Sequence, residues 1–88
     1  MKSAEKQELK AKAHHLRPVI LVGAKKLTPG VISETDLALT THELIKIKIN
    51  DAERDDRKII VQELCTQLHA ELIQLIGNTA ILFRKKPS

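Results

Sequence analysis

The chain has 88 residues and a mass of 9.9 kDa, which is the size of one domain with a modest core. It contains no run of about 18 apolar residues, so no membrane-spanning helix is expected. The charged first residues predict no secretory signal. A single cysteine, Cys65, excludes a disulfide framework and a cysteine-based zinc site, and it fits a cytoplasmic protein.

The net charge of +4 is unevenly distributed along the chain. Residues 1–30 carry a net charge of +5, residues 31–83 carry −4, and residues 84–88 add +3. Such separation is typical of a protein with a polyanionic partner, although ordinary soluble domains also show it. Because the chain has no Trp or Tyr and only one Phe, binding that depends on bases stacked on aromatic side chains is not expected.

The hydrophobic pattern of the first 23 residues predicts a helix followed by a strand. The helix begins with Ser3 as its N-cap and ends near residue 15 or 16, because Pro18 disfavours helix in the residue before it. Residues 18–22 are apolar and β-branched and are bounded by Pro18 and Gly23. This pattern predicts a short buried strand.

A second helix and a second strand follow. Thr28 and Pro29 are the N-cap and first residue expected of a helix. Leu37 points away from the apolar face of that helix, so it is expected to be exposed. In residues 44–49, isoleucines at every second position alternate with Leu44, Lys46 and Lys48. This pattern predicts a strand with its isoleucines facing inward.

The last third of the chain predicts a helix and a hairpin. Asn50 or Asp51 caps the helix, whose buried stripe consists of Ile60, Val61, Leu64, Cys65 and Leu68. Strands over residues 72–76 and 79–83 are joined by Gly77-Asn78, a hairpin signal. The predicted fold is therefore a single α/β domain of order α-β-α-β-α-β-β, with a mixed four-stranded sheet.

Residue combinations typical of enzymes are missing from the sequence. His42-Glu43 resembles the start of a zinc-protease motif, but Lys46 stands where the second histidine belongs. His14-His15 diverge on a helix and cannot share a metal ion. Cys65 lies on an apolar stripe and is expected to be a core residue. We therefore expect no catalysis, no metal, no cofactor and no small-molecule substrate.

The segment after the first predicted strand is the most informative for function. Gly23 gives the loop backbone freedom, Lys25 and Lys26 add positive charge, and the loop leads into a helix N-terminus. These features together are suited to binding phosphate groups. Strand–glycine–helix connections are common, so an ordinary surface loop remains an alternative at this point.

Four blocks of the sequence carry a resemblance to a known family. They are Leu9-Lys10-x-x-Ala13-His14-x-Leu16-x-Pro18-Val19, Val22-Gly23-x-x-x-Leu27-Thr28-x-Gly30-Val31, His42-Glu43-Leu44-Ile45-Lys46-Ile47-Lys48 and Ile76-Gly77-Asn78-Thr79-x-x-Leu82-Phe83-Arg84. In this order and spacing they resemble the YhbY family, the bacterial stand-alone form of the CRM (chloroplast RNA splicing and ribosome maturation) domain.

The resemblance implies a fold similar to the C-terminal domain of the third bacterial translation initiation factor. It also implies an RNA-binding protein that associates with precursors of the large ribosomal subunit and assists their assembly. The KH-like GxxG loop of the family corresponds to Gly23-Ala24-Lys25-Lys26. This chain departs from the motif at Lys26, where a positive φ would be costly for lysine while the ammonium adds charge.

We accordingly predict a CRM-type RNA-binding domain over residues 1–84, followed by a basic tail over residues 85–88. The expected partner is ribosomal RNA or a pre-large-subunit particle, bound by a monomer mainly through phosphates. Arg84, Lys85 and Lys86 are expected to form a mobile basic tail. The alternative is a protein-interaction module that uses Leu37 and an acidic third helix. The candidate RNA-binding residues are Gly23, Ala24, Lys25, Lys26, Lys2, Lys6, Lys10, Arg17, Lys46 and Lys48, the last two being less favoured if a helix covers their face of the sheet.

Overall fold

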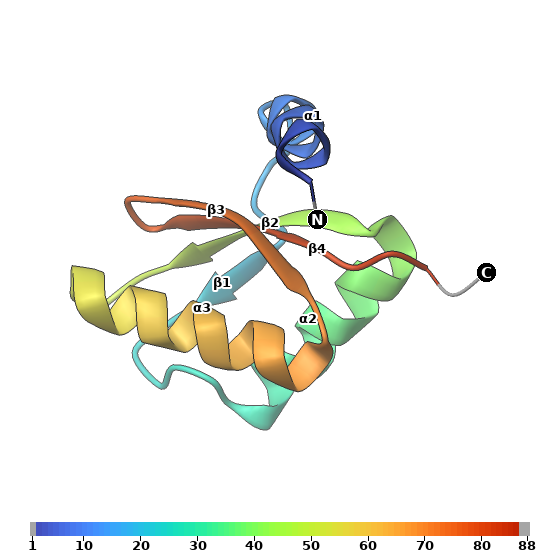
Figure 1. The fold of residues 1–88 in the computed structure, drawn as a ribbon. Helices are drawn as coiled ribbons and strands as arrows, with labels where there is room; N and C mark the ends of the chain where they lie inside the picture. Colours follow the sequence, from blue (N-terminus) through green and yellow to red (C-terminus); the bar gives the residue numbers. More distant parts are fainter. Residues whose placement is uncertain (1, 87–88) are drawn as a thin grey trace.

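A computed structural model describes residues 2–86 and contains three helices and one four-stranded sheet in the predicted order (Figure 1). The predicted single α/β domain is therefore confirmed. The elements are α1 (Ser3–Ala13), β1 (Ile20–Val22), α2 (Pro29–His42), β2 (Leu44–Ile49), α3 (Arg54–Leu68), β3 (Glu71–Ile76) and β4 (Thr79–Phe83).

The sheet is mixed, with strand order β1-β2-β4-β3. β1 runs parallel to β2, and β4 runs antiparallel to both of its neighbours, β2 and β3. The hairpin predicted at Gly77-Asn78 is present, and Gly77 has the positive φ of +56° that this tight turn requires. The hairpin returns the chain into the middle of the sheet, so β4 fills the gap between β2 and β3.

The two faces of the sheet are covered unequally (Figure 1). We call the face under α2 and α3 the inner face and the face that carries α1 the outer face. Ile45, Ile47 and Ile49 lie on the inner face and are at most 1% exposed, as their alternation predicted. They pack with the predicted stripe of α3 in the main core, where truncating one large side chain costs about 2–5 kcal/mol.

The outer face holds a second, smaller cluster. Ala13 of α1 packs there with Ile73 and Ile81, and Leu9 and Phe83 border the cluster. α1 packs mainly on β2 and β3 and leaves the β1 edge uncovered. The prediction of a fully buried first strand is therefore wrong, because Leu21 on the outer face is 59% exposed.

Three helix boundaries differ from the prediction. α1 ends at Ala13, two residues early, and Lys2 rather than Ser3 is its N-cap, without a side-chain hydrogen bond. α3 starts from Glu53 rather than Asn50 or Asp51. Asp51 has a φ of +56°, so the chain turns there before the helix begins. The start of α2 is as predicted, since Thr28 Oγ1 accepts the Val31 N–H at 3.2 Å.

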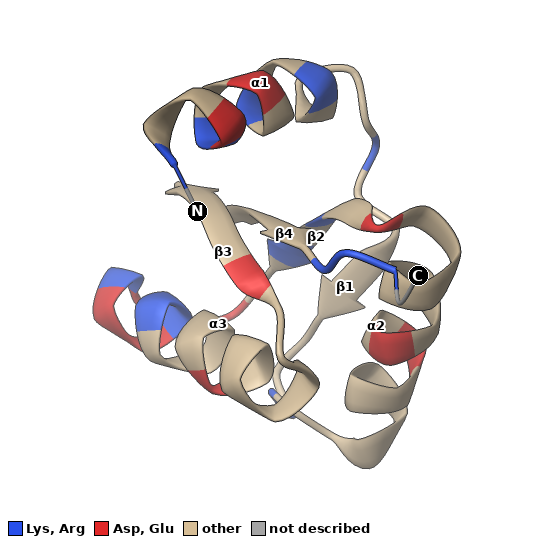
Figure 2. Cartoon of the chain, turned by 45° about the vertical axis from the view of Figure 1, so that its right-hand side comes forward, with Lys and Arg blue, Asp and Glu red and all other residues tan. Residues whose placement is uncertain are grey.

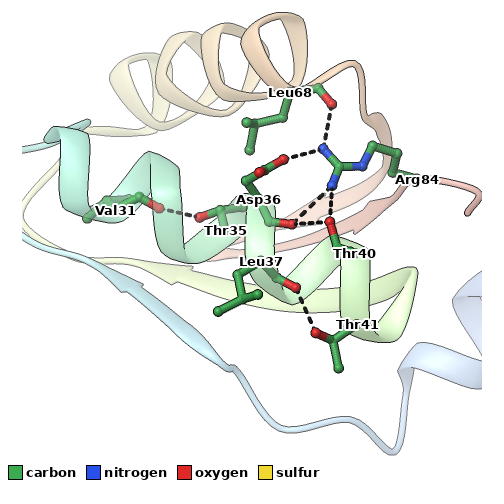
Figure 3. A network of polar contacts seen from close by, with 8 residues as sticks. All are labelled: Val31, Thr35, Asp36, Leu37, Thr40, Thr41, Leu68 and Arg84. Atoms are coloured by element: carbon green, nitrogen blue, oxygen red, sulfur yellow. Dashed lines mark hydrogen bonds and ion pairs between the residues drawn. The ribbon is translucent and has the colours of Figure 1, made fainter.

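Arg84 connects three elements of the fold (Figure 3). Its guanidinium pairs with the Asp36 carboxylate at 2.7 Å and donates to the Leu68 carbonyl at 3.0 Å, the Asp36 carbonyl at 3.0 Å and the Thr40 hydroxyl at 2.9 Å. The prediction of a mobile tail beginning at Arg84 is therefore wrong. The Lys86 N–H also bonds the Glu43 carboxylate at 2.7 Å. Residues 87–88 of the predicted tail lie outside the described residues.

Cys65 makes the stability of the fold sensitive to pH in the alkaline range. Burial of the thiol, with a smaller contribution from the charge of Glu71, raises the pKa of Cys65 from 9.0 to about 11. The protonated thiol is thus favoured by the folded chain. The resulting stabilisation is complete below the pKa that the Cys65 thiol has in the unfolded chain. It is lost as pH rises toward the pKa of the thiol in the folded chain.

We expect the free energy of unfolding to fall by on the order of 1 kcal/mol between neutral pH and about pH 10 because of this thiol. Urea unfolding of the wild-type and Cys65→Ala proteins, followed by circular dichroism at both pH values, measures it. The difference between the two proteins isolates Cys65 from the lysines, which also titrate. Equal losses in the two proteins would contradict this assignment.

Candidate nucleic-acid interface

The predicted phosphate-binding loop is a closed turn between β1 and α2. The Lys26 N–H donates to the Gly23 carbonyl at 3.0 Å, and the Thr28 N–H donates to the Lys26 carbonyl at 3.0 Å. Thr28 then caps α2, so the turn delivers the chain directly to a helix N-terminus. A helix N-terminus carries partial positive charge, which adds to that of the loop lysines.

Lys26 has a φ of +60°, the left-handed conformation that glycine adopts most readily. The loop therefore reaches this conformation despite the lysine, at a cost of roughly 1–2 kcal/mol. The Lys26 ammonium donates to the carbonyl oxygen of Asp51, which fastens the loop to the connection between β2 and α3. Lys26 is half-buried, whereas Lys25 is exposed.

Gly23 is not required by the fold itself. It has no positive φ, and a Cβ added to it would meet no atom within 4 Å. Ala24 beside it is exposed. The open surface at Gly23 and Ala24 leaves the backbone of the loop accessible to a partner.

The lysines of α1 lie far from this loop. Lys2 is exposed and Lys6 and Lys10 are half-buried. α1 lies above the outer face, while the loop lies below the sheet beyond the end of β1 (Figure 1). Acidic residues alternate with the lysines along α1 (Figure 2). The structure thus does not join the α1 lysines and the loop into one continuous basic surface.

Lys46 and Lys48 lie on the outer face of β2, which α1 covers only in part. Lys48 is exposed and Lys46 is half-buried. The register places Lys48 between Leu21 of β1 and Thr79 of β4, with Ile76 of β3 next in the row. Leu21 and Ile76 are 59% and 62% exposed, so this row is an uncovered surface. The helix expected to cover Lys46 and Lys48 covers them only in part.

A cleft of about 500 Å³ lies beside Lys46, where α1, the segment after it and the start of β2 meet. Arg17 lines this cleft together with Lys46. The lining also includes Phe83, the only aromatic Phe, Tyr or Trp residue of the chain. Sequence analysis missed the cleft because its walls come from segments far apart in the chain. The full lining is Leu9, Lys12, Leu16, Arg17, Val19, His42, Glu43, Leu44, Ile45, Lys46 and Phe83.

The features of the alternative protein-interaction module are present only in part. Leu37 is 67% exposed, as expected. α3, however, carries three basic and three acidic residues and has no net charge, so the description of this helix as acidic is wrong. Its acids gather near the N-terminus, where Asp55 and Asp56 lie in the first turn beside Arg54.

Three further features concern residues 2–86. No helix in this part of the chain is long and apolar enough to cross a membrane. Within the same range, no group of three His, Cys, Asp or Glu side chains is placed to hold a metal ion. His14 and His15 pack edge to face, with ring centroids 5.8 Å apart.

Comparison with known proteins gives consistent results. The chain is 47% identical to a protein of Pseudomonas aeruginosa named as a probable RNA-binding protein, over 94% of this chain and 80% of the other. It is 39% identical to an RNA-binding protein of Haemophilus influenzae, over 96% and 85% of the two chains. The solution structure of a Staphylococcus aureus protein, for which RNA binding has been suggested, matches with a TM-score of 0.87 and 26% identity, over 100% of this chain and 92% of that one.

The model of the CRS1/YhbY (CRM) domain family matches residues 1–84, which is nearly the whole chain. The resemblance found in the four sequence blocks is thereby confirmed. The chain belongs to the CRS1/YhbY (CRM) domain family.

Proposed function

We propose that this protein binds ribosomal RNA in precursors of the large ribosomal subunit and assists their assembly by binding, without catalysis. The observation that carries the proposal is the loop Gly23–Lys26, which has a left-handed fourth residue and an exposed lysine, Lys25, just before α2. The RNA-binding names of the relatives support the RNA partner. The ribosomal assignment rests on the resemblance to the YhbY family.

Phosphate contacts dominate the proposed interface. The loop offers Lys25 and the backbone of Gly23 and Ala24, and the outer face offers Lys46 and Lys48. Lys2, Lys6 and Lys10 at and within α1, and Arg17 after it, are further basic positions of the proposed interface. Recognition of folded RNA by charge and shape follows from such an arrangement. The proposal includes a monomeric cytoplasmic protein with no small-molecule substrate.

A salt titration tests this mode of binding. Deproteinised large-subunit ribosomal RNA is the probe, and its affinity for the protein is measured by filter binding over a range of KCl concentrations. Contacts from Lys25, Lys26, Lys46 and Lys48 predict that log affinity falls with log salt with a slope of roughly −3, since each phosphate contact contributes about 0.7–0.9. A slope near zero would contradict the proposal and favour an apolar protein interface around Leu37.

A further inference from the structure

Apolar residues make up much of the lining of the cleft beside α1. Leu9, Leu44 and Phe83 line it, and all three are only partly buried by the small cluster of the outer face. Leu16 and Val19, which are 37% and 52% exposed, line it from the segment that links α1 to β1. The volume of about 500 Å³ lies within the range of protein sites that hold small organic groups. The cleft thus offers a partly exposed aromatic ring to an apolar occupant.

Basic residues also line the cleft. Lys12, Arg17 and Lys46 line it, and within residues 2–86 none of the three forms an ion pair. Glu43 is the acidic residue of the lining, and its carboxylate already accepts the Lys86 N–H at 2.7 Å. The occupant that complements this cleft therefore combines an apolar body with a negative charge.

Glu43 fixes one side of the cleft. It has a φ of +62°, which is unfavourable for a residue with a side chain. Three hydrogen bonds hold it there: its N–H donates to the Leu39 carbonyl at 2.9 Å, its carbonyl accepts the Arg84 N–H at 2.9 Å, and its carboxylate accepts the Lys86 N–H. His42, the residue before Glu43, also lines the cleft.

We propose that the cleft binds one unpaired nucleotide of RNA, with the base against Phe83 and Leu44 and the phosphate near Arg17. Unpaired bases bind on aromatic side chains, and a guanidinium matches a phosphate with two parallel hydrogen bonds. Lys46 and Lys48, two residues apart on the same face of β2, continue the positive charge from the cleft across the open outer face. This inference rests on the proposed function and adds a site that contacts a base.

Nuclear magnetic resonance of the whole protein tests the site with small probes. The probes are the four nucleoside 5′-monophosphates, uridine without phosphate, and ribose 5-phosphate without a base. The monophosphates are expected to shift the resonances of Leu9, Val19, Leu44 and Phe83. Ribose 5-phosphate is expected to bind roughly tenfold more weakly, because it lacks the stacking contribution of the base.

Three variants locate the interaction. Phe83→Leu keeps an apolar side chain at this position of the lining. It is expected to abolish the preference for monophosphates over ribose 5-phosphate. Arg17→Ala is expected to weaken the monophosphates to the level of uridine. Lys58→Ala removes one exposed positive charge from α3, away from the cleft, and is expected to change neither affinity. Thermal unfolding by circular dichroism checks that each variant is folded.

Several results would overturn the site. The first is equal binding of ribose 5-phosphate and the monophosphates. The second is the absence of resonance shifts at millimolar concentrations of the probes. The third is that an acidic apolar peptide shifts the resonances and none of the nucleotides does. Binding of large-subunit ribosomal RNA is measured in parallel. If the wild type, Phe83→Leu and Arg17→Ala bind that RNA equally, the cleft proposal fails and the proposed function stands. If the wild-type protein does not bind it, the proposed function fails.

Discussion

Replacing Lys25 and Lys26 together by alanine is expected to weaken binding to large-subunit ribosomal RNA by roughly 30-fold, at about 1 kcal/mol for each lost phosphate contact. The slope of log affinity against log salt is expected to become shallower by about 1.4–1.8, since each contact contributes about 0.7–0.9. Filter binding at several salt concentrations measures both quantities. Lys25 should contribute more than Lys26, because the Lys26 ammonium is bound to the Asp51 carbonyl.

A matched control separates the contribution of the loop to RNA affinity from that of positive charge elsewhere on the protein. Arg54→Ala with Lys58→Ala removes the same charge from two exposed positions of α3 and is expected to change affinity much less. Lys26→Gly restores the GxxG motif and, like Lys26→Ala, removes the ammonium, so the two variants should bind with equal affinity. Unchanged affinity in a folded Lys25→Ala/Lys26→Ala protein would show that the loop is not the contact. An equal loss in the α3 variant would leave no special role for the loop.

Arg84→Met is expected to lower the free energy of unfolding by about 2–3 kcal/mol, because hydrogen bonds to a charged group are among the stronger ones. The Arg84 side chain is 22% exposed, and its guanidinium contacts both α2 and the end of α3. The substitution leaves the Leu68 carbonyl without its Arg84 donor, while methionine preserves much of the apolar part of the arginine side chain. Such a change is a large fraction of the stability of a small domain.

Urea unfolding followed by circular dichroism measures the effect, since the chain has no Trp or Tyr for fluorescence. Asp36→Asn is the control. It weakens only the ion pair with a carboxylate whose side chain is 55% exposed, and a loss of about 0–1 kcal/mol is expected. An unchanged urea midpoint for Arg84→Met would contradict the role assigned to this network.

Local sequence patterns predicted the order of the elements well. The alternation over residues 44–49 was sufficient to assign the inner face of β2, and Thr28-Pro29 was sufficient to place the start of α2, because short-range rules govern both features. Gly77-Asn78 likewise determined the hairpin. The exposure of Leu21 was not predictable in this way, since an apolar strand does not reveal whether a neighbouring helix covers its second face.

The candidate site was only partly predictable. The loop was found because Gly23, Lys25 and Lys26 are close in the sequence. The left-handed conformation of Lys26 depends on the surrounding turn, which a residue preference does not contain. Arg84 contacts Asp36 across 48 positions, and the cleft joins α1, β2 and the end of β4. No short-range pattern encodes such contacts, so the structure was needed to find them.

Sedimentation of a cell lysate through a sucrose gradient, with detection of this protein at low and at high salt, tests the central claim most directly. Electrostatic binding to ribosomal RNA in large-subunit precursors predicts that the protein migrates with large-subunit particles at low salt and is released at high salt. Residence at the top of the gradient under both conditions would contradict the ribosomal assignment.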